Sequence, residues 1–400
     1  MNKPLSVCLC IAFVILLSGC GKREISDLAL VMAVGLDKGK QEGTVRVTAQ
    51  IARPADARGQ TGAPSGQTGE PIYSISAEGR TIFEAIRNLA RFSSRRIFWA
   101  HNFVIVINED YARDGIMDVI DFFSRNHELR MRTWVAVTPH AAHELVSTQT
   151  GLEVIPGQSV DRLFRYNEIV AEAPRTDMRQ LLAAYLSRTS HPILARLTLK
   201  GRGTSNKKPQ EHGSIDQVEL SGTGIFRKDK LIGTLDSKES QALLYFTERV
   251  ESAVVPIPCP DDKKNEASLE LRYQRFTVEP TYQNGKIYFD VRLKTYVDMV
   301  ESGCRSRLSQ AELMQLMEEP LEKVLKERLE KVVKAAQRTY KVDFLELGKY
   351  FENKYPKEWK KVRDRWEEEF PRAVVRVHVE TEINNPVLLE ERVNQRGENK

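Results

Sequence analysis

The chain has 400 residues, of which 41% are hydrophobic and 29% charged, so it has room for two or three domains that each bury a core. This balance excludes a disordered acidic or basic tail. The net charge is only +5, and acids alternate with bases along the chain, which excludes the clustered basic face of a nucleic-acid-binding protein. We therefore expect no nucleic-acid partner.

The first residues predict export. Lys3 supplies a positive start, and the eleven residues of 7–17 are apolar. As a helix this stretch rises about 16 Å, roughly half the hydrocarbon core of a bilayer. It therefore fits the apolar region of a signal peptide better than a membrane span.

Four residues at the end of this stretch resemble the bacterial lipobox. They are Leu17, Ser18, Gly19 and Cys20. In that motif the cysteine thiol receives a diacylglyceryl group, and the peptide bond before it is cut. Cys20 is thus the predicted lipidation site, with Leu17, Ser18 and Gly19 as the signal-peptidase motif. Two acyl chains anchor a protein stably without spanning the membrane. The alternative is an ordinary secretory signal with a chance cysteine.

Two cysteines remain once Cys8 and Cys10 leave with the signal peptide and Cys20 is lipidated. These are Cys259 and Cys304. In an exported protein such a pair can form a disulfide, here closing a loop of about 46 residues. The alternative is two independent buried thiols, and the sequence leaves both open.

The N-terminal half is expected to alternate strands and helices. The apolar and β-branched runs predict strands at 28–36, 44–51, 72–76, 103–107, 131–138 and 193–199. Helices are expected after the capping box of Thr81 and Glu84 and at 115–125 and 177–188. An amphipathic helix between two buried strands, at 103–138, predicts a βαβ unit.

The C-terminal half is dominated by two hairpins and long helices. One hairpin is expected at 218–235, followed by a helix capped by Asp236, and another at 269–297 around Asn284-Gly285. A long helix is predicted over 320–338. Because Pro320 suits a first helical turn, any helix before it should be separate or kinked. A half-buried strand is expected at 373–383.

We predict an α+β (mixed α/β) fold of three consecutive domains, with mixed sheets flanked by helices and no standard enzyme architecture. The Gly- and Pro-rich residues 53–71 are expected to form a flexible loop, and the polar residues 200–216 the main boundary. The divisions are a signal peptide at 1–19, an N-terminal domain at 20–200, a small middle domain at 217–260, a C-terminal domain at 266–390 and a tail at 391–400.

Catalytic and metal motifs are absent from the sequence. His140, His143 and Glu144 form the pattern H-x-x-H-E, whereas zinc proteases have H-E-x-x-H or H-x-x-E-H. The sequence also has no G-x-S-x-G motif and no phosphate-binding loop. We expect no enzyme activity, no metal and no cofactor. A late aromatic cluster is expected to be core packing; its members are Tyr350, Phe351, Tyr355, Trp359 and Trp366.

The chain resembles the Ger(x)C family, the lipoprotein C subunits of nutrient germinant receptors in spore-forming bacteria. Five stretches carry the resemblance, in order, at 19–39, 97–138, 222–246, 259–260 and 355–371. Together they cover nearly the whole mature chain. Only Cys20 and its lipobox neighbours carry over residue by residue, because the family has no catalytic residues.

The resemblance implies a non-enzymatic subunit on the outer face of the spore inner membrane. It would be held there by its lipid and act with two integral membrane subunits, A and B, to trigger germination in response to nutrients. The alternative is an extracytoplasmic solute-binding lipoprotein that captures a small molecule directly. A solute binder usually has two similar α/β lobes, which the hairpins and long helices of the C-terminal half disfavour.

Overall fold

The computed structural model describes residues 27–53, 72–148, 150, 152–153, 155–204, 214–248, 250–260, 263–304 and 309–384. Several predictions fall outside these residues. They are the signal peptide with Cys20, nearly all of the expected loop, and the tail.

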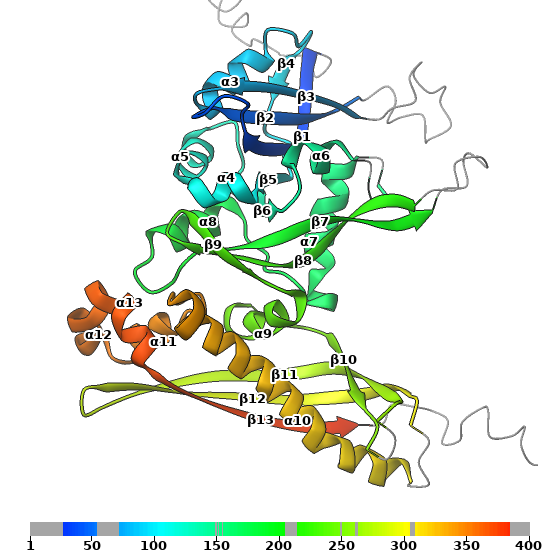
Figure 1. Ribbon diagram of the computed structural model, residues 1–400, viewed down its shortest axis with the longest axis vertical. Helices are drawn as coiled ribbons and strands as arrows, with labels where there is room; N and C mark the ends of the chain where they lie inside the picture. Colours follow the sequence, from blue (N-terminus) through cyan, green and yellow to red (C-terminus); the bar gives the residue numbers. More distant parts are fainter. Residues whose placement is uncertain are drawn as a thin grey trace, which may run out of the picture.

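The N-terminal part builds a nine-stranded sheet in the order β3-β2-β1-β5-β6-β7-β8-β9, with β4 beside β1 (Figure 1). Its strands are β1 (Leu28–Lys38), β2 (Val45–Ala52), β3 (Ile72–Gly79), β4 (Arg96–Phe98), β5 (Val104–Asn108), β6 (Trp134–Thr138), β7 (Ile193–Thr204), β8 (Ser214–Arg227) and β9 (Lys230–Leu235). The central strands β1, β5, β6 and β7 are parallel, and both edges are antiparallel.

Six helices cover this sheet. They are α3 (Ile82–Leu89), α4 (Glu109–Asp114), α5 (Met117–Arg125), α6 (Ala142–Ser147), α7 (Pro156–Val170) and α8 (Met178–Leu186). The buried side chains of α3, α4, α5 and α8 pack in one core, and those of α6 and α7 in another. A parallel sheet buried on both faces explains the near-continuous apolar strands, and the parallel pairing of β5 with β6 confirms the predicted βαβ unit.

The C-terminal part builds a four-stranded sheet in the order β10-β11-β12-β13. Its elements are α9 (Ser237–Thr247), β10 (Ala253–Pro258), β11 (Glu266–Gln283), β12 (Lys286–Ser302), α10 (Gln310–Lys334), η3 (Ala335–Tyr340), α11 (Leu347–Lys354), α12 (Pro356–Val362), η4 (Arg363–Arg365), α13 (Trp366–Glu369), η5 (Phe370–Arg372) and β13 (Val374–Asn384). Two mixed sheets with helices confirm the predicted mixed α/β class.

The long hairpin of β11 and β12 turns at Asn284 and Gly285, whose φ angles of 51° and 76° match the positive values that such a turn requires. The apolar face of the sheet packs on α9 and α10, and α10 crosses it in Figure 1. The late aromatic cluster is core, as predicted, since Phe351, Trp359 and Trp366 are buried against one another.

The expectation of a separate helix before Pro320 was wrong. A single helix, α10, begins at a Ser309–Glu312 capping box and runs through the proline. The proline costs about 3 kcal/mol in a helix interior, but tertiary packing outweighs that local term. Buried side chains four residues apart form one stripe across it, namely Leu313, Met317, Leu321, Leu325 and Leu329.

The Cys259 and Cys304 sulfurs are bonded, with the two Cα atoms 5.3 Å apart. Cys259 follows the last residues of β10 and Cys304 those of β12. The bond therefore links the C-terminal ends of two strands at the same end of the second sheet. Of the two alternatives left open by the sequence, the structure has the disulfide.

The expected boundary at 200–216 does not separate two sheets. β7 and β8 pair across it as antiparallel neighbours, so β8 and β9 complete the first sheet. β10, in contrast, pairs with β11 in the second sheet. Residues 217–260 therefore have no sheet of their own. A polar, glycine-containing segment looks the same in sequence whether it joins two domains or two strands of a hairpin.

A buried carboxylate organises the turn between η3 and α11. Asp343 is 1% exposed and accepts hydrogen bonds from the backbone N–H of Leu347 (3.1 Å) and Gly348 (2.6 Å) and from Trp366 Nε1 (3.0 Å). Burial raises its pKa to about 7, because desolvation of the charged form outweighs these donors.

We expect this group to make stability pH-dependent. An aspartic acid in the unfolded chain has a pKa of about 3.9, so the folded state holds the proton on Asp343 to a higher pH than the unfolded state does. The stabilisation that this proton gives the folded state is therefore lost as the pH rises through about 7. In Asp343→Asn the drop in urea-unfolding midpoint between about pH 5 and about pH 8 should shrink. The exposed Asp364→Asn is the control, and parallel pH curves for Asp343→Asn and wild type would contradict the assignment.

Candidate functional site

The sequence-predicted sites divide into those outside the described residues and those with a structural role. The lipidation motif at 17–20 lies outside. His143 Nδ1 lies 3.2 Å from Asp37 Oδ2, and the Asp37 carboxylate also accepts from the backbone N–H of Ala142 (2.6 Å) and His143 (2.9 Å). Asp37 thus holds the start of α6. Among the described residues, no three His, Cys, Asp or Glu side chains gather as a metal site.

A cleft opens between the two sheets, at the C-terminal end of α9. Three adjoining hollows of about 450, 550 and 390 Å³ form it. All three have Glu248 in their walls, and the first two also share Arg175 and Gln180. The first hollow has Trp134 of β6 in its wall and the third has Gln274 and Phe276 of β11, so the three together border both halves of the chain.

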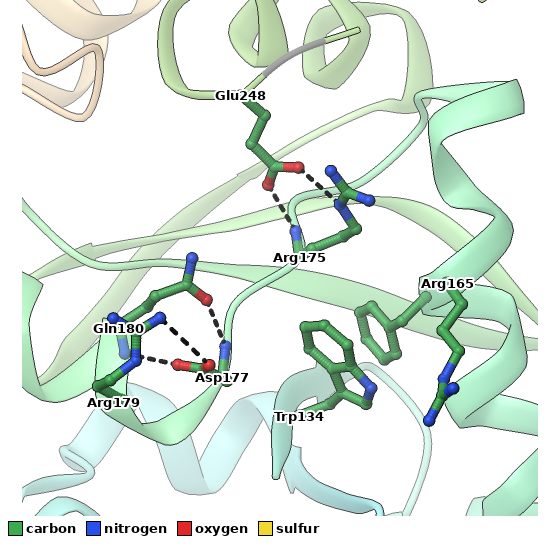
Figure 2. Close-up of a pocket in the computed structure, with 8 residues that line it drawn as sticks. Trp134, Arg165, Arg175, Asp177, Arg179, Gln180 and Glu248 are labelled. Atoms are coloured by element: carbon green, nitrogen blue, oxygen red, sulfur yellow. Dashed lines mark hydrogen bonds and ion pairs between the residues drawn. The ribbon is translucent and has the colours of Figure 1, made fainter. Parts of the chain in front are cut away.

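An ion pair spans this cleft. Figure 2 shows the Glu248 carboxylate directed at Arg175. Its oxygens accept from the Arg175 backbone N–H at 2.6 Å and from Nε at 3.1 Å. Arg175 lies between α7 and α8 of the N-terminal unit, and Glu248 is the residue after α9. Both side chains are mostly buried, so the pair fastens the end of α9 to the first sheet.

The first hollow has an aromatic floor. Trp134 and Phe164 stack with ring centroids 5.0 Å apart, and Trp134 Nε1 donates to Asp161 at 2.8 Å. Asp161 also pairs with Arg165 at 2.8 Å. Arg179 lies on the opposite side of Trp134 from Arg165 in the close-up (Figure 2). The arginine side chains at the rim are two-thirds exposed, so this hollow is open and cationic at its edge.

The third hollow reaches the inner face of the second sheet. Tyr245 and Phe246 of α9 line it together with Gln274 and Phe276 of β11. The Tyr245 hydroxyl and both amide atoms of Gln274 are buried and have no hydrogen-bond partner among the described residues. Buried polar atoms in proteins are nearly always hydrogen-bonded. This hollow therefore offers donors and acceptors beside aromatic walls, which suits binding of a neutral polar group.

The sequence did not point to this cleft. A helix was predicted to begin at Asp177, and the structure shows a capping box of Asp177 with Gln180 there, but Arg175, Glu248 and Gln274 were not singled out. They lie in three segments separated by many residues, and no local spacing relates them. A polar residue, Gln274, within the alternating apolar run of β11 was the one local signal available.

Two protein-family models match the chain in order. The first, described as a spore germination protein N-terminal domain, matches residues 21–199. The second, described as spore germination B3/GerAC like, C-terminal, matches residues 221–386. Together they cover most of the chain, and the point at which one gives way to the other falls in the hairpin of β7 and β8.

Individual proteins are similar over the same length. Spore germination protein KC of Bacillus subtilis (strain 168) is 27% identical over 97% of this chain and 98% of its own length. Spore germination protein B3 of the same strain is 21% identical over 94% of this chain and 96% of its own. The crystal structure of the GerBC protein matches with a TM-score of 0.53 and 20% identity, over 89% of this chain and 98% of that one. That last likeness shows a shared fold.

None of the helices in the described part of the chain has the length and apolar character needed to cross a bilayer.

The ion pair in the cleft gives a stability prediction. Glu248→Ala removes the acceptor of two hydrogen bonds and should lower the free energy of unfolding by about 1–3 kcal/mol. Glu248→Gln keeps an oxygen for the Arg175 backbone N–H and should cost less. Urea unfolding measures both, with the exposed Glu251→Ala as control. Equal losses for the Ala and Gln variants would show that the backbone hydrogen bond contributes nothing.

Proposed function

The chain belongs to the Ger(x)C family of spore germination proteins, and from this membership we propose that it is the lipid-anchored C subunit of a nutrient germinant receptor. In this role it acts in spore germination without catalysing a reaction. It works with two integral membrane subunits, A and B, on the outer face of the spore inner membrane.

The observation that carries this proposal is the order and extent of the family match. An N-terminal and a C-terminal spore germination model match this chain in order, and relatives of nearly the same length align with almost all of it. A chain that shared only one domain could have a different architecture and role. This chain spans both.

The anchor is assigned to Cys20. The lipobox residues Leu17, Ser18 and Gly19 precede it, and the first described residue, Asp27, follows seven positions later. A diacylglyceryl group there provides the two chains that stable membrane attachment requires. It would hold the first sheet close to the membrane, since β1 begins at Leu28.

The test is nutrient-triggered germination of spores that lack the gene, complemented with wild type or with Cys20→Ala. Wild type should restore germination. Cys20→Ala should not, and its protein should be released from the membrane fraction, because one lipid attachment site supplies both acyl chains. Cys8→Ala serves as a second cysteine control, because it leaves both Cys20 and the Cys259–Cys304 bond in place. Normal germination in the deletion strain across a broad nutrient panel would contradict the receptor role.

A second function is favoured by the third hollow of the cleft. There the unpartnered Tyr245 hydroxyl and Gln274 amide face aromatic side chains, as in a site that captures a small neutral molecule. This is the solute-binding alternative, and it assigns ligand capture to the C subunit itself.

Thermal shift with a panel of neutral nutrients tests this second function. A ligand at a hundredfold excess over its dissociation constant should stabilise the chain by about 2.7 kcal/mol. Gln274→Leu should abolish that shift without destabilising the free protein, since it removes unsatisfied polar atoms from a buried position. Gln283→Leu, at the exposed end of the same strand, is the control. A shift that survives in Gln274→Leu would place the ligand elsewhere.

A further inference from the structure

The second sheet has one covered and one open face. Side chains of β12 alternate strictly, and those pointing toward α9 and α10 are buried, as Phe289, Val291 and Leu293 show. The alternate positions, among them Arg292 and Lys294, are exposed. α9 and α10 pack on the buried face, and Lys354 at the end of α11 pairs with Glu279 of the open face.

Three positively charged side chains lie in two neighbouring cross-strand pairs of the open face, which we call the basic rows. Arg275 of β11 lies directly opposite Lys294 of β12, and Arg292 is two residues along β12 from Lys294. In such a register directly opposed Cβ atoms are about 5 Å apart and diagonal ones about 7–8 Å. His378 of β13 lies beside Arg292 and extends the same row.

This arrangement costs folding stability. Like charges directly opposite one another across two strands are destabilising. Lys294 has one weak compensation, Glu380 at 4.0 Å. Neither Arg275 nor Arg292 forms an ion pair with any residue that the structure describes. Because no described carboxylate compensates Arg275 or Arg292, the charge of these two side chains is available to a partner.

Aromatic side chains flank the basic rows. Tyr273 and Tyr296 form the next row, with ring centroids 5.9 Å apart, and Tyr273 is 58% exposed. Lys294 Nζ lies 5.8 Å from the Tyr296 ring centroid. Exposed tyrosine beside arginine is the composition of protein-binding surfaces rather than of an ordinary solvated face.

Acids bracket the basic rows and decide the kind of partner. At one end Glu270 and Asp298 hold Arg272, and at the other Glu279 and Asp290 form a row of their own. A flat anionic bilayer pressed on this face would meet those carboxylates as well as the cations. A narrow acidic stretch lying along β11 and β12 would contact Arg275, Arg292 and Lys294, with Glu380 and Glu382 of β13 to one side of it.

We propose that this open face of the second sheet, centred on Arg275, Arg292 and Lys294, docks an acidic segment of a partner protein. Carboxylates on alternate residues of an extended segment, about 7 Å apart, match the spacing of the basic rows. The proposal deepens the proposed function, since a receptor subunit must contact other proteins, and it rests on that function for the partner's place in the receptor.

A binding experiment on the whole purified chain tests it. The probe is a fluorescent ten-residue polyglutamate peptide, titrated at low and at physiological salt. The double variant Arg275→Gln, Arg292→Gln should weaken binding about tenfold. The matched control is Lys323→Gln, Lys326→Gln, which removes the same charge from the exposed side of α10. Equal loss in both double variants would mean non-specific attraction and overturn the proposal.

A stability readout separates docking from a structural role. Arg275→Gln relieves the opposed pair, so the free protein should melt about 1–2 °C higher while peptide binding weakens. A lower melting temperature would make Arg275 a structural residue and overturn the proposal. Vesicles of phosphatidylglycerol and phosphatidylcholine form the lipid arm. If they bind with the same dependence on Arg275 and Arg292 while the peptide does not, the surface is a membrane contact instead.

Failure of the proposed function gives a different pattern. In that case deletion of the gene leaves nutrient germination unchanged, whereas peptide binding in vitro keeps its dependence on Arg275 and Arg292.

Discussion

The burial of α9 between the two sheets is the constraint on which the rest of the structure depends. Seven consecutive residues of this helix, Ser240 to Phe246, are buried, which a helix covered on one side only does not show. Two of its buried polar residues, Ser240 and Gln241, are satisfied from opposite sides. Ser240 Oγ hydrogen-bonds Thr223 of β8 at 2.8 Å, and Gln241 accepts from Arg328 of α10 at 2.9 Å. α9 thus joins the first sheet to the helix that covers the second.

The cleft is a consequence of that junction. Where α9 ends, its last turn leaves the two sheets apart, and Glu248 bridges the gap to Arg175. Elsewhere the halves are fastened by Tyr340, whose hydroxyl donates to Thr234 of β9 at 2.9 Å. Gly233 lies against the Tyr340 ring, and a Cβ at this position would clash with that ring. The contacts of Glu248 and Tyr340 thus fix the angle between the two sheets on either side of α9.

The two faces of the second sheet differ because α9 and α10 pack on only one of them. Its inner face is occupied by α9 and α10, so its outer face is left to alternate polar and aromatic side chains. Part of its edge is protected, because Glu322 and Glu318 of α10 accept hydrogen bonds from the backbone N–H of Thr381 and Ile383 on β13. These two hydrogen bonds block this part of the edge against the addition of another strand.

The sequence by itself determined the local elements and the family, because hydrophobic period, capping boxes and the Asn284-Gly285 turn act over a few residues. It also predicted the βαβ unit, the mixed α/β class and the aromatic core around Phe351. Only the tertiary structure decided that α10 runs through Pro320, since packing on the sheet outweighs one missing hydrogen bond. The same holds for the hairpin across 200–216, the Cys259–Cys304 bond and the cleft at Glu248. Each depends on which distant segments meet, and pairing over such separations leaves no periodic signal in the chain.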